Sequence, residues 1–135
     1  MPDMTIGKLA KQTDVTVETI RYYERRGLLP KPRRTPAGYR LYPPEAVPRL
    51  RFIKRARDLE FTLDEVTQLL SLRGDPGAGC DTVERMARER LTRLTARIRE
   101  LQEARERLER LVQRCEGGDR CAVLQALDAG IPEHR

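Results

Sequence analysis

Aromatic residues are scarce in this sequence: only 4% of its 135 residues are Phe or Tyr and none is Trp, whereas 36% are charged. So few large side chains suit a thin core, and this composition favours a mainly all-α fold. The sequence also lacks an apolar run of eighteen residues, and Met1 to Met4 show no signal-peptide pattern. We therefore expect a cytoplasmic protein with no membrane partner.

Histidine and cysteine are also scarce, with one and three residues respectively. His134 lies in the tail, and the sequence has neither a Ser/His/Asp set nor a pair of carboxylates in a context that would form a cleft. We therefore do not expect an enzyme. In a reducing compartment, an odd number of cysteines is more typical of free thiols than of disulfides.

One long stretch, residues 81–115, contains no proline and no glycine. Its apolar residues recur at alternating steps of three and four, which predicts a coiled-coil helix roughly 50 Å long at about 1.5 Å per residue. Asp81 is the expected N-cap, and Arg105 interrupts the apolar seam, where it would snorkel or fix the register. The residues of the predicted dimerisation seam are Leu91, Leu94, Ile98, Leu101, Leu108 and Val112, flanked by Ala87 and Cys115.

An exposed apolar stripe of this length requires a partner. If the partner is a second, antiparallel copy, Cys80 of one chain arrives beside Cys115 and Cys121 of the other. Two equivalent clusters of three thiols then form, one at each end of the dimer. Because soft sulfur ligands select soft metal ions, this convergence predicts a metal site at Cys80, Cys115 and Cys121.

Positive charge is concentrated between Arg21 and Arg57, where twelve Lys or Arg residues accompany only two acids, Glu24 and Glu45. Such a block is the electrostatic footprint of a polyanion partner, and we interpret that partner as nucleic acid. The rest of the chain from residue 76 onwards is nearly balanced in charge, which is typical of a solvated helix surface.

The basic block coincides with a helix-turn-helix pattern. Two short helices, capped by Thr5 and Thr16, are expected over residues 5–12 and 16–26 and are joined by about three residues. The basic loop 28–42, rich in Pro and Gly and ending in a short strand, follows as a wing, and two more helices begin near residues 43 and 62. We divide the chain into a winged-helix DNA-binding domain (1–75), a hinge (76–80), a dimerisation helix (81–115), and a metal-binding loop with a short helix and tail (116–135).

With these residues in view, the chain resembles the MerR family of transcriptional regulators over nearly its whole length. Two positions depart from the family pattern: Asp14 and Glu60 stand where glycine is usual, and Asp tolerates left-handed backbone better than most residues. The motifs that carry the resemblance are Ile6-Gly7-Lys8-Leu9-Ala10, Val17-Glu18-Thr19-Ile20-Arg21-Tyr22-Tyr23-Glu24, Gly27-Leu28-Leu29, Gly38-Tyr39-Arg40 and Arg49-Leu50-Arg51-Phe52-Ile53.

The resemblance implies a homodimer with two winged-helix heads, linked by an antiparallel coiled coil and bound across a palindromic promoter element. Members of the family repress without inducer and activate with it, by distorting the promoter for RNA polymerase; such deformation costs a few kcal/mol in general. By analogy, the expected DNA contacts are Thr19, Arg21, Tyr22 and Tyr23 at the recognition helix, Tyr39 and Arg40 at the wing, and Arg49, Arg51, Lys54 and Arg55 at the second wing and its helix.

Retention of Cys80, Cys115 and Cys121 resembles the branch of the family that responds to divalent soft metals. Three thiolates suit Hg(II), so a mercury-responsive activator of heavy-metal resistance genes is the favoured hypothesis. Zn(II), Cd(II) or Pb(II), with an efflux system as the regulated target, stays open, because the short step from Cys115 to Cys121 and the Leu124–Leu127 ending are closer to those members. A fourth ligand would be His134, Asp119 or water.

Two alternatives of other classes also remain. A thiol-based redox sensor on the same scaffold would use the three cysteines to form a disulfide instead of a metal site. A structural DNA-binding protein would bind without sequence preference and would not respond to metal.

Overall fold

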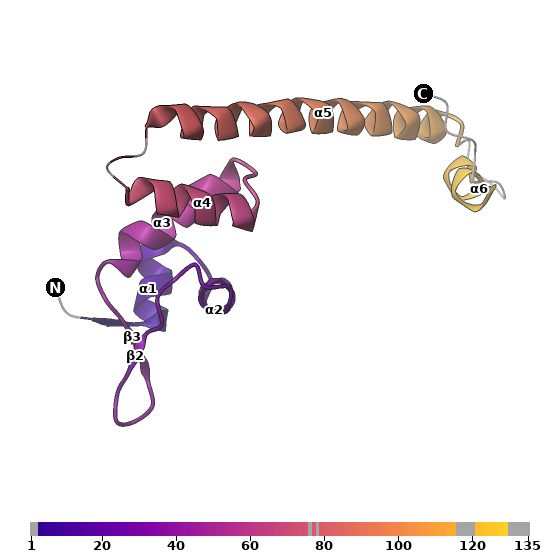
Figure 1. Cartoon of the computed structure of the whole chain (residues 1–135). Helices are drawn as coiled ribbons and strands as arrows, with labels where there is room; N and C mark the ends of the chain where they lie inside the picture. The colour runs from indigo at the N-terminus through magenta and orange to yellow at the C-terminus, as the bar shows by residue number, and fades with distance from the viewer. Residues whose placement is uncertain (1–2, 76, 78, 116–120, 130–135) are drawn as a thin grey trace. The chain divides into compact units, whose positions relative to one another are not determined.

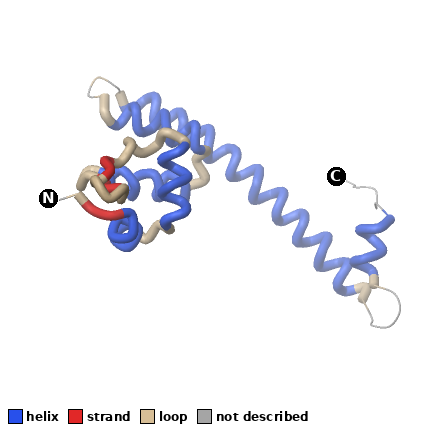
Figure 2. Tube along the Cα trace, turned by 90° about the horizontal axis from the view of Figure 1, so that it is seen from below, coloured by secondary structure: helices blue, strands red, loops and turns tan. Residues whose placement is uncertain are grey.

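The computed structural model describes residues 3–75, 77, 79–115 and 121–129. It divides the chain into two compact units, Met1–Ala87 and Arg88–Arg135, which we call the head and the helical unit. Helix predominates over strand throughout the described chain (Figure 2). The expected mainly all-α fold with a small β wing is confirmed.

Two short helices, α1 (Ile6–Thr13) and α2 (Val17–Arg25), form the helix-turn-helix at the start of the head (Figure 1). Each begins at a threonine whose hydroxyl accepts a backbone N–H bond that the first turn leaves unused. Thr5 Oγ1 accepts from the N–H of Lys8 at 3.3 Å, and Thr16 Oγ1 accepts from that of Thr19 at 3.1 Å. Both caps are those expected from the sequence.

A three-stranded antiparallel sheet joins the two ends of the winged segment, with strand order β1-β3-β2. It consists of β1 (Met4–Thr5), β2 (Arg33–Arg34) and β3 (Arg40–Tyr42). The strand at the end of the loop was expected, whereas β1 and β2 were not, because two residues are too few to show a period of two. The hairpin β2–β3 forms the wing (Figure 1).

Helices α3 (Ala46–Asp58) and α4 (Leu63–Arg73) complete the head. Pro48 lies in the first turn of α3, where its missing N–H has no helical partner to lose. Thr62 and Glu65 form a reciprocal capping box at the start of α4. The largest fully buried side chains of the head come from every part of it: Leu9, Ile20, Leu28, Tyr42, Leu50, Ile53 and Val66.

The long helix α5 spans Cys80–Gln113, and α6 spans Ala122–Ala129. Asp81 is therefore not the N-cap that the sequence predicted, because the helix begins at Cys80. Asp81 lies within the first turn, where the helix dipole stabilises a negative charge. Neither helix contains a buried residue among those described. Among the described residues, no helix combines the length and the apolar character needed to cross a bilayer.

Candidate nucleic-acid interface and metal centre

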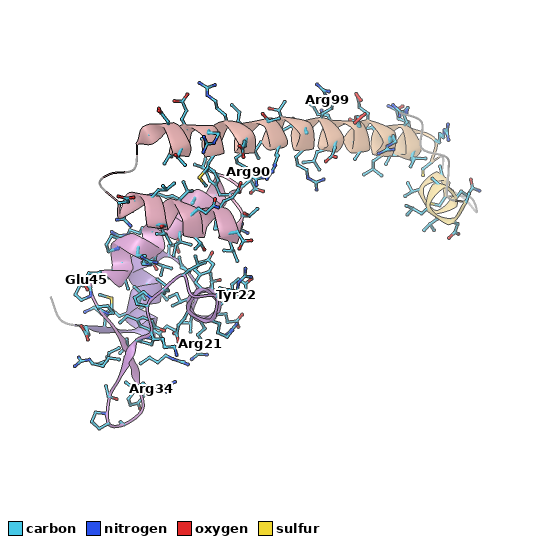
Figure 3. All side chains as sticks on the ribbon, viewed as in Figure 1. Arg21, Tyr22, Arg34, Glu45, Arg90 and Arg99 are labelled. Atoms are coloured by element: carbon cyan, nitrogen blue, oxygen red, sulfur yellow. The ribbon has the colours of Figure 1, made fainter. Side chains whose placement is uncertain are left out.

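Helix α2 presents a cationic and aromatic surface built around Tyr22. The hydroxyl of Tyr22 accepts a hydrogen bond of 2.8 Å from Nη1 of Arg26, and the guanidinium groups of Arg25 and Arg26 lie 6.0 and 5.7 Å from its ring centre. Arg21 is exposed on the same helix (Figure 3). Rigid aromatic and guanidinium groups on a recognition helix are well suited to contact phosphates and base edges.

The other two predicted residues of α2 are less accessible. Thr19 is half-buried, and its hydroxyl accepts a bond of 2.8 Å from the Thr16 hydroxyl, so it contributes to the start of the helix. Tyr23 is buried, with 8% of its surface exposed, and packs in the head core. Its position stabilises the helix rather than presenting the ring to a partner, and the interface proposed below does not use it.

The wing adds further positive charge. Tyr39 at its tip is 69% exposed, and Gly38 beside it has φ +89°, a conformation that favours glycine. Arg33 forms an ion pair of 2.9 Å with Asp3, and Arg34 Nη1 donates to the carbonyl of Gly38 at 3.4 Å. These arginines, like Arg25 and Arg26, were absent from the predicted contact set, although the charge block of the sequence contains them.

Where the wing meets α2, the carboxylate of Glu24 interacts with two side chains of β3. The hydroxyl of Tyr42 donates to Oε1 of Glu24 at 2.6 Å, and Nε of Arg40 lies 3.8 Å from Oε2. Burial raises the pKa of Tyr42 well above its usual range, and the hydrogen bond to Glu24 and the negative charge of that carboxylate raise it further. Tyr42 is therefore a neutral, buried donor.

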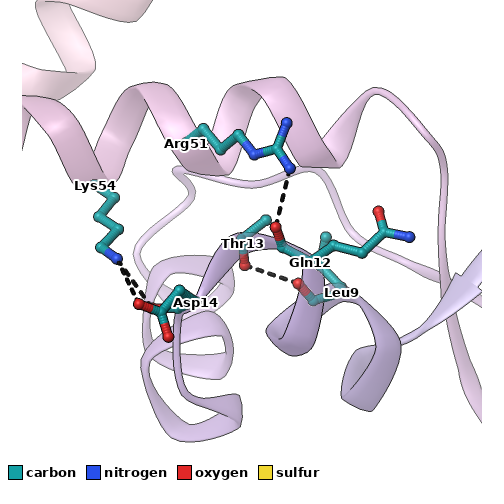
Figure 4. A network of polar contacts seen from close by, with 6 residues as sticks. All are labelled: Leu9, Gln12, Thr13, Asp14, Arg51 and Lys54. Carbon is teal, nitrogen blue, oxygen red and sulfur yellow. Dashed lines mark hydrogen bonds and ion pairs between the residues drawn. The ribbon is translucent and has the colours of Figure 1, made fainter.

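Three of the four basic residues predicted on α3 are engaged within the head. Arg49 Nε donates to the carbonyl of Leu28 at 2.6 Å. As Figure 4 shows, Arg51 donates to the carbonyl of Gln12 at 3.0 Å and Lys54 to that of Asp14 at 3.2 Å. The last two cations lie at the C-terminal end of α1, where positive charge favours the helix dipole.

These contacts give the α3 cations a structural task that the sequence did not reveal. Arg51 and Lys54 hold the turn between α1 and α2 against α3, and Arg49 holds the segment that follows α2. Arg55 is the exposed fourth member of the set. A cation that satisfies a carbonyl still carries its charge, so the row contributes to the positive surface of the head.

In the helical unit, the structure brings Cys115 and Cys121 together. A backbone N–H bond from Leu124 lowers the pKa of Cys121; partial burial opposes this shift, and bonds from the Val123 N–H and the Cys115 thiol support it. Cys121 directly precedes α6, so its sulfur faces the free N–H groups of that helix. A thiolate in this position is a ready ligand for a soft metal ion.

The third thiol, Cys80, is exposed at the first residue of α5. Within one chain, no cluster of three or more His, Cys, Asp or Glu suited to a metal ion occurs among the residues that the structure describes. The predicted alternatives for a fourth ligand, Asp119 and His134, lie outside those residues. The two neighbouring sulfurs fit a soft metal ion in their chemistry, and a third donor has to come from elsewhere.

Known proteins similar to this chain are consistent with both the cationic surface of the head and the cysteines of the helical unit. Residues 4–72 match the family described as MerR HTH family regulatory protein, and residues 47–111 match the family described as MerR, DNA binding. The chain is 42% identical to the HTH-type transcriptional regulator ZntR of Escherichia coli (strain K12), over 93% of this chain and 92% of that protein. It is 39% identical to the mercuric resistance operon regulatory protein of Bacillus cereus, over 90% and 95% respectively.

A solved structure resembles the chain equally broadly. It is that of the transcription regulator PbrR691 from Ralstonia metallidurans CH34 in complex with lead(II), with a TM-score of 0.73 and 37% identity over 92% of this chain and 98% of that one.

Proposed function

Because this chain belongs to the MerR family of helix-turn-helix regulatory proteins, we propose that it is a metal-responsive transcriptional regulator that acts as a homodimer on promoter DNA. The exposed residues Arg21 and Tyr22 on α2 and Arg26 at its C-cap, together with the wing, support the DNA-binding part of this proposal. Two heads related by a two-fold axis would bind the two halves of a palindromic element.

The apolar face of α5 supports the homodimer. Leu91, Ile98, Leu101, Leu108 and Val112 are each more than half exposed in the single chain. A contiguous apolar stripe on a helix of 34 residues requires cover, and a second copy in antiparallel orientation supplies the same stripe. Dimerisation through this seam would place the partner subunit's Cys80 near Cys115 and Cys121.

The observation that carries the metal response is the position of Cys121 directly before α6, with the thiol of Cys115 close enough to help lower its pKa. These two sulfurs, with the partner subunit's Cys80, would form a trigonal thiolate site, and three thiolates suit Hg(II). We therefore favour a mercury-responsive regulator of heavy-metal resistance genes. The alternative is a regulator of an efflux system that responds to Zn(II), Cd(II) or Pb(II). The relative named for mercuric resistance fits the first assignment, and the similar structure in complex with lead(II) fits the alternative.

The proposed consequence of metal binding is a change in promoter geometry. The cysteines lie at the two ends of the long helices, so a site shared between subunits would couple metal binding to the arrangement of the heads. Distortion of the promoter by the two heads would then allow RNA polymerase to use it, and deformation energies of this kind are a few kcal/mol.

The decisive experiment is a competitive titration of the reduced dimer with Hg(II), Cd(II), Pb(II) and Zn(II), combined with transcription from the cognate promoter. Two ions per dimer, with Hg(II) displacing the others in three-coordinate form, would support the mercury assignment. Tight four-coordinate binding of Zn(II) or Cd(II) would shift the assignment to an efflux regulator.

Single substitutions then test the site itself. Cys80→Ser, Cys115→Ser and Cys121→Ser should each abolish induction and leave operator binding nearly intact, and normal induction in any one of them would remove that cysteine from the site. If the wild-type dimer binds no metal stoichiometrically but changes its promoter activity with peroxide, the neighbouring thiols act in a redox sensor instead.

A further inference from the structure

Glu24 occupies the junction between the two parts of the head that carry the candidate DNA contacts. It belongs to α2, with Arg21 three residues earlier on the same helix, and its side chain is only 16% exposed. Its two carboxylate oxygens face two residues of β3: Oε1 accepts the hydroxyl of Tyr42 at 2.6 Å, and Oε2 lies 3.8 Å from Nε of Arg40.

The two groups that Glu24 holds differ in function. Tyr42 is fully buried, so its bond to Glu24 fixes the strand against the helix from inside the core. Arg40 lies next to the exposed wing residue Tyr39, and its side chain is 31% exposed although its Nε is buried. The accessible part of Arg40 is therefore the rest of its side chain, on the surface of the wing strand.

Nε of Arg40 has no hydrogen-bond partner among the residues that the structure describes. Its separation from Glu24 is that of an ion pair, and a shortening of about 1 Å would turn the contact into a charge-assisted hydrogen bond. A buried polar atom without a partner costs free energy, so a shorter contact between Nε of Arg40 and Glu24 would be favourable. We expect a bound ligand to shorten it. An anion bound to Nη1 and Nη2 of Arg40 would hold the guanidinium group in one orientation.

We propose that Glu24 is a positioning residue for DNA recognition: its carboxylate orients the guanidinium of Arg40 toward a DNA phosphate. This inference rests on the proposed DNA-binding function and adds a residue that does not itself touch DNA. It makes a counterintuitive prediction, because removing a negative charge from a DNA-binding surface ordinarily strengthens binding.

The test compares Glu24→Gln with Glu18→Gln in the full-length dimer. Glu18 is an exposed acid on the same helix, so its substitution changes the net charge equally without disturbing the wing. The probe is a duplex that the wild-type protein selects from a random-sequence pool, with a scrambled duplex for non-specific binding. Thermal unfolding of each variant is measured in parallel to confirm that it is folded.

We expect Glu24→Gln to weaken binding to the selected duplex roughly tenfold, the scale of one charge-assisted hydrogen bond. The slope of log affinity against log salt should fall by about one, because one phosphate contact is lost. Glu18→Gln should bind as tightly as the wild type or slightly more tightly. Equal affinities for the two variants would overturn the proposal.

A double-mutant cycle with Arg40→Gln identifies the route. Arg40→Gln alone should reproduce the loss and the change in salt slope, and adding Glu24→Gln to it should cause no further loss. A further tenfold loss in the Arg40→Gln background would show that Glu24 acts by another path, and would refute the proposal. Failure of the wild-type protein to prefer its selected duplex over the scrambled one would instead refute the DNA-recognition function on which the proposal rests.

Discussion

The head and the helical unit contain the same apolar residue types but differ in how far these residues are buried. In the head, Leu9, Ile20, Leu50 and Ile53 are fully buried against one another. In the helical unit, Leu91, Ile98 and Leu101 are equally apolar and more than half exposed. The head therefore contains its own hydrophobic core, whereas the helical unit exposes an apolar face that a second copy would cover in the proposed dimer.

This contrast separates what each unit can do alone. Burial of apolar surface within the head stabilises the surfaces of α2 and the wing without help from another chain. If the proposed dimer forms, the stability of the helical unit should depend on protein concentration, because its apolar face is covered only on association. Substitutions in one unit should therefore leave the property of the other unit unchanged.

Replacing Ile98 with Asp should disrupt the dimer. Each copy would lose about 1.5–3 kcal/mol of apolar burial and place a charge on the seam, so the dimer dissociation constant should rise at least roughly a thousandfold. Sedimentation equilibrium measures the change. Ala96→Asp, two residues away on the side of the helix opposite the seam, is the matched control and should leave the dimer intact; a dimeric Ile98→Asp variant would show that the seam is assigned wrongly.

Replacing Ile53 with Ala should have the reverse pattern. Ile53 is fully buried in the head, so the cavity should lower the free energy of unfolding by about 2–5 kcal/mol, measured by urea denaturation. The dimer dissociation constant should stay unchanged, because no seam residue is altered. Arg55→Ala, on the exposed face of the same helix, serves as the control; if it destabilised the head as much, cavity formation would not be the cause.

Removing an arginine should weaken DNA binding when the arginine belongs to the α2 surface of the head, but not when it belongs to the helical unit. Arg21→Ala on α2 should weaken operator binding by about 1–3 kcal/mol with or without metal, and reduce the salt slope by about one if its contact is to phosphate. Arg99→Ala on α5 (Figure 3) removes the same charge from a helix surface and should leave affinity unchanged. Fluorescence anisotropy with the selected duplex measures both; equal losses would mean that overall charge alone governs binding.

The sequence predicted the regular features of both units and missed those that depend on distant partners. The helix-turn-helix, its threonine caps and the exposed seam follow from local spacing. By contrast, the bonds from Arg51 to Gln12 and from Lys54 to Asp14 join residues 39 and 40 positions apart, and no local pattern encodes them. The sequence also indicated that one of Tyr22 and Tyr23 packs in the core while the other faces phosphate, and the structure shows that Tyr23 is the buried one.

The departures from the family pattern at Asp14 and Glu60 are a case in which the sequence located a physical feature. Both residues have positive φ, 57° and 70° respectively, the conformation that glycine favours. Asp14 is held there by Lys54, whose Nζ also lies 3.4 Å from its Oδ2. Glu60 follows the C-cap of α3, and the same pattern of closing hydrogen bonds ends α2, where the corresponding residue is Gly27.

The smallest predicted effect uses that internal comparison within the head. The N–H of Glu60 donates to the carbonyl of Arg57 at 2.9 Å, and that of Phe61 to Ala56 at 3.2 Å; Gly27 and Leu28 donate to Glu24 and Tyr23 in the same way at 3.1 and 2.9 Å. A residue with a Cβ is strained in this left-handed position by about 1–2 kcal/mol, and the greater backbone freedom of glycine in the unfolded chain offsets part of the gain.

Glu60→Gly should therefore raise the free energy of unfolding of the head by about 1 kcal/mol, measured by urea denaturation. Glu60→Ala is the control, since it removes the same charge but keeps the Cβ, and it should give little or no stabilisation. Equal stabilisation by both variants would assign the effect to the charge of Glu60 and not to its backbone. Dimer dissociation should be unaffected in either variant, because the strain lies wholly within the unit that has its own core.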